Sequence, residues 1–162
     1  MEFEVAHEFE ADVERVAEAL LDLDFQASLE DVGALAGRKV LSQEENGDKV
    51  VRRIRCVLDI NVDGVVRKFI GDSDPAWVEV GEWDSSRAQW RWHIEPEAAA
   101  HLLEAAGKTV LLPSDNGTIR KVTGTVKVKV PLYGGKVERW IIDGLERAYD
   151  EEAGYLARWL HA

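Results

Sequence analysis

Cysteine and positive charge are both scarce in this 162-residue chain. Cys56 is the one cysteine, so no disulfide can form within the chain. There are 31 acidic residues and only 20 lysines and arginines, which gives a formal net charge of −11. Nucleic acids and anionic membrane surfaces are bound by clustered positive charge. The sequence has no such cluster, and we expect neither partner.

Long apolar runs and a secretory signal are also missing. No stretch approaches the roughly 20 apolar residues that cross a bilayer. The opening residues, MEFEV, contain neither the basic segment nor the apolar segment of a signal peptide. We therefore expect a cytoplasmic protein with no membrane span. A composition of 46% apolar and 31% charged residues is typical of a globular chain. A length of 162 residues is close to the commonest domain size, so we predict a single domain over residues 1–162.

The first part of the chain predicts one strand followed by two short helices. Apolar and acidic residues alternate from Phe3 to Phe9, the period of a half-buried strand. Asp12 is suited to be the N-cap of a helix that continues to Leu21. A second helical piece is predicted for Phe25–Val32, where Gly33 ends it.

Turn-forming residues in the middle of the chain predict an antiparallel meander. They occur at Asn46-Gly47, Asp63-Gly64, Asp84-Ser85-Ser86 and Asn116-Gly117. The strands expected between them are Lys39–Glu45, Lys49–Ile60, Val65–Gly71, Trp77–Trp83, Gln89–Glu95, Thr109–Leu112 and Thr118–Val130. Alanine content predicts a helical turn over Glu97–Ala106.

The last part of the chain predicts one long amphipathic helix, from about Lys136 to Leu160. Its broad apolar face comprises Val137, Ile141, Leu145, Ala148, Tyr149, Tyr155, Leu156 and Trp159. The predicted fold class is therefore α+β, with a curved antiparallel sheet of about seven strands wrapped around this helix.

This order of elements resembles the START-like superfamily, also known as SRPBCC or Bet v 1-like. The segment GTVKVKVPLYGGKVE, from Gly124 to Glu138, is similar to the strand-to-helix junction of an uncharacterised bacterial branch of that superfamily. That branch lies near the polyketide cyclases and lipid-transfer proteins. The resemblance implies a helix-grip fold whose cavity, between sheet and helix, is commonly occupied by hydrophobic molecules. It implies no catalytic residues.

Glu152 and Arg52 are the polar candidates for such a cavity. A helical wheel places Glu152 in the middle of the apolar face of the last helix. A carboxylate there needs a partner or a raised pKa, which would serve a ligand site, although it would equally serve a structural ion pair with an arginine. Arg52 shares one strand face with Ile54, Cys56, Leu58 and Ile60, so it is phased to enter the cavity. The alternative is a solvated strand end.

Aromatic residues supply the candidate walls. Six tryptophans are most simply explained as core, but aromatic side chains also line concave pockets. We expect Trp92, Trp159, Tyr149 and Tyr155 to line a pocket. His93 and Glu95 should face solvent, because they alternate with Trp90 and Trp92. We therefore predict no metal site and no cofactor.

Three functions agree with these patterns. The leading hypothesis is binding or transport of a hydrophobic or amphipathic small molecule, lipid-like or polyketide-like, in an internal cavity. An alternative is a cyclase, aromatase or dehydratase that uses Glu152 and Arg52 for acid–base chemistry, although no catalytic motif is recognisable. A third is a protein-interaction or co-chaperone-like domain with an acidic surface.

Overall fold

Seven antiparallel strands form one open sheet in the computed structural model, which describes residues 1–35, 37–57 and 64–162. The order across the sheet is β1-β7-β6-β5-β4-β3-β2, so the first strand pairs with the last. The strands are β1 (Glu2–Phe9), β2 (Lys39–Asn46), β3 (Lys49–Val57), β4 (Ala76–Asp84), β5 (Gln89–Pro96), β6 (Leu103–Ser114) and β7 (Gly117–Val128).

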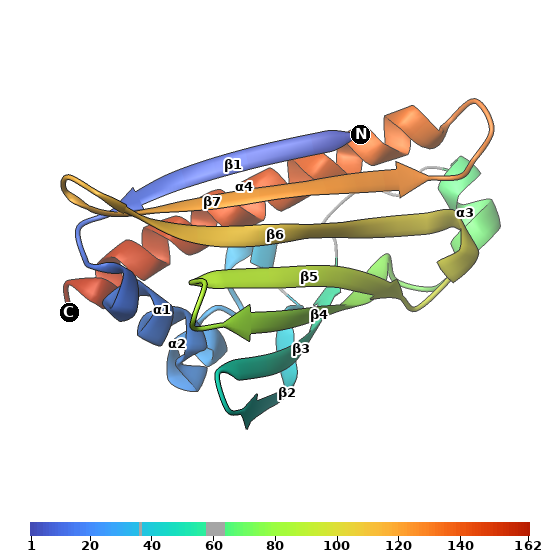
Figure 1. The fold of residues 1–162 in the computed structure, drawn as a ribbon. Coiled ribbons are helices and arrows are strands. Elements are labelled where there is room, and N and C mark those ends of the chain that lie inside the picture. Colours follow the sequence, from blue (N-terminus) through green and yellow to red (C-terminus); the bar gives the residue numbers. More distant parts are fainter. Residues whose placement is uncertain (36, 58–63) are drawn as a thin grey trace.

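One long helix runs along a face of this sheet, and short helices lie at its two ends (Figure 1). The α-helices are α1 (Val13–Leu21), α2 (Leu23–Ser28), α3 (Gly64–Ile70) and α4 (Gly134–Leu160), and single 3₁₀ turns occur at η1 (Gly33–Leu35) and η2 (Ala100–Leu102). Helices α1 and α2 lie near the C-terminal end of α4, whereas α3 lies near the opposite end. The predicted α+β, helix-grip arrangement is confirmed. No helix within the described ranges is both long enough and apolar enough to cross a membrane.

Two aspartates cap the helices at the start of the chain, and Asp12 is the N-cap that the sequence predicted. The Asp12 carboxylate accepts a hydrogen bond from the Arg15 backbone N–H at 2.8 Å and so caps α1. Asp22 ends α1 and caps α2, accepting from the N–H groups of Asp24 and Phe25. The two helices therefore follow each other without a loop.

The segment predicted as the strand Val65–Gly71 is instead helix α3, and that prediction was wrong. Its β-branched residues favour a strand locally, but Val65, Val66, Phe69 and Ile70 recur at helical spacing. Gly71, with φ +62°, ends the helix, and its N–H bonds to the Arg67 carbonyl at 2.8 Å.

The helical turn predicted over Glu97–Ala106 was also largely wrong. Only Ala100–Leu102 form a 3₁₀ turn, and β6 already begins at Leu103, much earlier than the predicted Thr109. Pairing with β7 over twelve residues outweighs the helix preference of alanine here. The predicted strand end at Leu58–Ile60 and Asp63 of the predicted Asp63-Gly64 turn lie outside the described residues.

The apolar core has two parts, one at each end of α4. Leu156 and Leu160 pack with α1, α2 and the tryptophans Trp83 and Trp90. Ile141 and Ile142, nearer the start of α4, pack with the β7 valines and the tryptophans Trp77 and Trp92. The polar residues described next lie between these two clusters.

Candidate functional site

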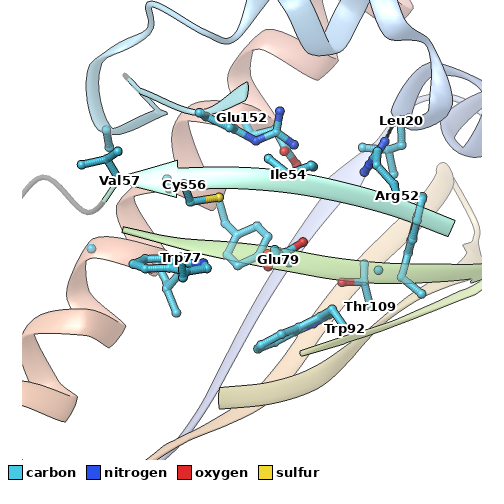
Figure 2. A pocket seen from close by; sticks show the side chains of 18 of the residues that line it. Leu20, Arg52, Ile54, Cys56, Val57, Trp77, Glu79, Trp92, Thr109 and Glu152 are labelled. Atoms are coloured by element: carbon cyan, nitrogen blue, oxygen red, sulfur yellow. Dashed lines mark hydrogen bonds between the residues drawn. The ribbon is translucent and has the colours of Figure 1, made fainter. Parts of the chain in front are cut away.

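A cavity of about 110 Å³ lies between the middle of α4 and the sheet (Figure 2). Strands β3 to β7 contribute its walls on one side, α4 contributes those on the other, and Leu20, Ala34 and Arg38 complete the lining. Its lining includes three arginines, Arg38, Arg52 and Arg120, and two glutamates, Glu79 and Glu152. A set of ionisable groups this dense is unusual inside a folded domain.

Strand alternation brings the residues of β3 and β4 to this cavity. Arg52, Ile54 and Cys56 share the inner face of β3, as predicted. Trp77 and Glu79 stand opposite Cys56 and Ile54 on β4. The outward residues of β3 form exposed ion pairs, Arg53 with Glu95 and Arg55 with Glu97.

Glu152 is buried on the apolar face of α4, where the helical wheel placed it, and its partner is Arg120. The Arg120 Nη1 donates to Glu152 Oε1, and Arg120 is only 1% exposed. Burial by itself would raise the pKa of the Glu152 carboxyl, but the guanidinium groups of Arg120, Arg38 and Arg52 outweigh burial and hold that pKa below its ordinary value. Glu152 is thus an ionised partner in a buried ion pair.

His7 extends this pair to the surface. Arg120 Nη2 lies 3.2 Å from His7 Nδ1, and His7 Nε2 lies 2.7 Å from the exposed Asp150. Arg120 Nη2 also donates to the Tyr149 carbonyl at 3.2 Å. His7 is therefore a half-buried, hydrogen-bonded histidine that is not among the residues lining the cavity.

Arg52 enters the cavity but does not pair with Glu152. Its Nη1 donates to the Leu20 carbonyl at 2.6 Å, and its guanidinium lies 4.5 Å from the centroid of Trp90. Burial, and after it the nearby charge of Arg38, lowers the pKa of Arg52 to about 10. Arg52 remains cationic at neutral pH and ties α1 to the sheet.

Arg38 is the arginine with spare hydrogen-bonding capacity. It is 9% exposed, and its Nη1 has no hydrogen-bond partner in the part of the chain that the structure describes. Three further N–H donors on cavity-lining residues lack a partner within the same described ranges: Trp77 Nε1, Trp92 Nε1 and Arg120 Nε. Across the described parts of the chain, the fifth buried side-chain atom in this condition is Gln26 Oε1, which does not line the cavity.

Glu79 is a carboxyl group that faces the cavity without a direct partner among the described residues. Removal from solvent raises its pKa, and the charges of Arg38 and Arg52 only partly oppose this. Burial, together with Glu79 and Glu152, likewise raises the pKa of the Tyr149 hydroxyl well above its ordinary value. Burial therefore shifts the ionisation of both groups toward the neutral form.

Trp92 lies across two glycines of the neighbouring strands. Gly107 is its partner on β6, and Gly124 is the partner of Gly107 on β7. A Cβ atom at Gly107 would lie 2.5 Å from the Trp92 ring and 2.1 Å from the Thr123 carbonyl oxygen, and one at Gly124 would lie 2.7 Å from the same ring. Bare backbone at both positions is what allows the indole to lie there.

Four of the six residues proposed from the sequence come together at the cavity, namely Glu152, Arg52, Tyr149 and Trp92. Tyr155 and Trp159 do not. Tyr155 is 37% exposed, because it lies about 100° around α4 from the buried Leu156, and its ring stacks on Arg158. Trp159 lies two turns beyond Glu152 and packs on Phe25, with 5.4 Å between ring centroids.

Sequence reasoning missed Arg120, Glu79 and Arg38. Arg120 alternates in phase with the buried Thr118 and Val122, and Glu79 with Trp77 and Trp83, so strand phase was a usable signal for both. Arg38 precedes β2 in an irregular segment, where no periodicity indicates which way a side chain points.

A second, apolar chamber of about 90 Å³ adjoins this cavity. It lies between α3, the segment from Pro96 to Leu103 and the first turns of α4. Trp77 lines both spaces, so its indole forms a shared wall. The two together present a polar and an apolar environment.

Metal ligation is not indicated in the part of the chain that the structure describes. No group of three potential metal ligands occurs there. His93 and Glu95 are half exposed on the outer face of β5, as the alternation with Trp90 and Trp92 predicted.

Solved structures of similar fold are numerous. The protein TTHA0849 from Thermus thermophilus is 22% identical, with a TM-score of 0.67, and the match covers 96% of this chain and 97% of that one. The ZhuI aromatase/cyclase from Streptomyces sp. R1128 is 14% identical, with a TM-score of 0.66, and 99% and 93% of the two chains are covered. Ara h 8.0201 is 17% identical, with a TM-score of 0.58 and coverage of 96% and 97%.

These likenesses confirm the START-like helix-grip fold that the sequence resemblance implied. No curated protein sequence matches the chain. A family model does match, over residues 4–160, and the chain therefore belongs to the family described as "Protein of unknown function (DUF2505)".

Proposed function

We propose that this protein binds a small molecule in the cavity between α4 and the sheet. The observation that carries the proposal is the set of buried N–H groups on cavity-lining residues that have no hydrogen-bond partner among the described residues. Leaving a buried donor unsatisfied costs about 1–3 kcal/mol. A guest with acceptor atoms would recover that cost, and the folds of an aromatase/cyclase and of Ara h 8.0201 agree with such a role.

The size of the cavity favours a small guest. An apolar cavity of roughly 150 Å³ holds one benzene molecule, so a space of about 110 Å³ suits a group of a few heavy atoms. An apolar portion of the guest would extend past Trp77 toward the adjoining chamber of about 90 Å³. We therefore favour a short amphipathic molecule over a multi-ring polyketide or a long-chain lipid.

The two alternatives from the sequence receive less support. Acid–base chemistry by Glu152 and Arg52 is disfavoured because Glu152 is bound to Arg120 and Arg52 to the Leu20 carbonyl. A role in protein interaction would need no polar cavity at all.

Filling the cavity from α4 tests the proposal. Ala148 lines the cavity on a helix, where leucine is well tolerated. We expect Ala148→Leu to weaken the binding of hexanoate and 1-hexanol, measured by tryptophan fluorescence and calorimetry, by about tenfold or more. Ala27→Leu, on the exposed side of α2, is the control and should bind as the unmodified protein does. The proposal would be refuted if neither compound bound the unmodified protein. It would also be refuted if Ala148→Leu bound both compounds as tightly as the unmodified protein does.

A further inference from the structure

We infer that the cavity selects an anionic guest, with Arg38 as the residue that receives its carboxylate or similar oxyanion. This inference rests on the proposed function and adds the chemical class of the ligand. It starts from the kind of atom that is left without a partner. Arg38 Nη1, Trp77 Nε1, Trp92 Nε1 and Arg120 Nε are all donors, so the matching group must be an acceptor.

The charge balance of the cavity points the same way. Among the described residues of the lining, three arginines face two glutamates, which gives at least one net positive charge in a protein whose formal charge is −11. Arg120 is committed to Glu152, and Arg52 is bound to the Leu20 carbonyl. Arg52 and Arg38 are thus the two arginines of the lining without a carboxylate partner among the described residues, and of these Arg38 is the one with no hydrogen bond there.

Arg38 has the geometry that a carboxylate requires. A guanidinium presents parallel N–H groups that bind both oxygens of a carboxylate at once. A guest with a hydroxyl or an amine in place of the carboxylate cannot form this pair of hydrogen bonds. No hydrogen bond to the Arg38 side chain occurs within the described residues, and the side chain is more than nine-tenths buried. Glu79 also faces the cavity but forms no ion pair with Arg38 in the described structure, so it does not occupy this role.

A set of three probes with one apolar body tests the inference. Calorimetric titration at pH 7.5 with hexanoate, 1-hexanol and hexylamine compares a carboxylate, a hydroxyl and an ammonium group on alkyl chains of similar length. We expect hexanoate to bind about tenfold or more tightly than either of the others. The indole N–H resonances of Trp77 and Trp92 should shift downfield with hexanoate and much less with 1-hexanol, because only the anion is a strong acceptor.

Substitutions at Arg38 locate the effect. Arg38→Met should reduce hexanoate affinity to the level of 1-hexanol while changing 1-hexanol affinity by less than about threefold. Arg38→Lys should retain most of the preference for hexanoate. Arg53→Met makes the same chemical change on the outward face of β3 and should leave all three affinities unchanged.

The outcomes separate this inference from the proposed function. Equal affinity for hexanoate and 1-hexanol, with both lost in Ala148→Leu, would overturn the anion preference and keep the binding role; water would then satisfy the orphan donors. Preference for hexylamine would overturn the inference and assign the site to Glu79. If Arg38→Met fails to fold, the probe comparison on the unmodified protein and Arg38→Lys still decides.

Discussion

Three arginines line one cavity, and each has a different set of contacts. Arg120 is held by a carboxylate, Arg52 by a backbone carbonyl and the Trp90 ring, and Arg38 by no hydrogen bond within the described residues. A buried guanidinium without acceptors is costly. The three arginines therefore differ in role although they are the same residue type. Their contacts indicate which of them stabilise the fold and which one is available to bind a ligand.

Cys56 is expected to be chemically inert in the folded protein. Cys56 is only half-buried, but removal of its thiol from bulk solvent, with the charge of Glu79 adding to the effect, raises the pKa of the thiol to about 12. Since the thiolate is the nucleophile, we expect iodoacetamide at pH 8 to label Cys56 about a thousandfold more slowly in the native state than in 6 M guanidinium chloride. Mass spectrometry measures both rates.

An exposed cysteine provides the control for that prediction. Ser85→Cys in a Cys56→Ser background places a thiol in the turn between β4 and β5, where labelling should be rapid in both states. The raised pKa also has a linked effect on stability: the preference for the neutral thiol stabilises the fold below about pH 9 and is lost as pH rises toward 12. Rapid native labelling of Cys56 would contradict the raised pKa of its thiol.

The alternation of side chains along a strand indicates from the sequence which residues of β3 and β7 face the cavity. Arg52 faces the cavity because it alternates with Ile54 and Cys56, and the same rule applied to β7 indicates Arg120. The partner of Glu152 is far from it in sequence, so nothing in the sequence pairs the two residues. Tyr155 was misplaced because one residue along a helix turns the side chain by about 100°.

At the level of elements, the Arg120–Glu152 pair fastens α4 to β7. The two residues lie between the apolar clusters at the ends of α4, where packing is interrupted by the cavity. A buried pair of this kind adds little over a good apolar contact, but losing one partner leaves an uncompensated charge. The pair therefore fixes where α4 lies more than it adds to overall stability.

Breaking one side of the pair should be costly. We expect Glu152→Ala to lower the free energy of unfolding by about 3–5 kcal/mol, measured by urea denaturation, because Arg120 would remain buried and unpaired. The double variant Arg120→Met/Glu152→Leu should recover most of that loss. The exposed pair Arg53 and Glu95 is the control, where Glu95→Ala should cost about 0–1 kcal/mol. A similar small cost for Glu152→Ala would show that the pair is not effectively buried.

The order of the elements was easier to predict than the identity of two of them. Asp12 marks the start of α1, and the apolar period of α4 is unambiguous over more than six turns. Helix α3 and the start of β6 were misassigned because local preference and tertiary environment disagree there. Valines in α3 cover the apolar chamber, and alanines at the start of β6 pair with β7.

For the molecule as a whole, charge is distributed unevenly between surface and interior. The chain is strongly acidic, with a calculated pI near 4.8, yet its cavity lining is net positive. Repulsion among surface carboxylates destabilises a compact state, and surface ion pairs such as Arg53–Glu95 recover only a little each. Net repulsion should therefore dominate the response to salt.

We expect sodium chloride to stabilise the protein at neutral pH. Raising its concentration from 20 mM to 500 mM at pH 7.5 shortens the screening length to a few ångströms and should raise Tm by several degrees, measured by circular dichroism. At pH 4.8, where the net charge is close to zero, the same addition should have a much smaller effect. A fall in Tm at pH 7.5 would mean that attractive pairs outweigh the repulsion.

The glycine pair beneath Trp92 bears on how a mutational survey of this protein would look. Substitution of Gly107 or Gly124 would drive new atoms into the indole, and at Gly107 also into the backbone of the adjoining strand. A saturation screen would accordingly record both positions as intolerant, although neither offers any reactive or binding group. Intolerance at these two positions would reflect the space that the Trp92 ring occupies. A map of mutation-sensitive positions would therefore overstate how many residues act in binding, unless the volume of each new side chain is considered first.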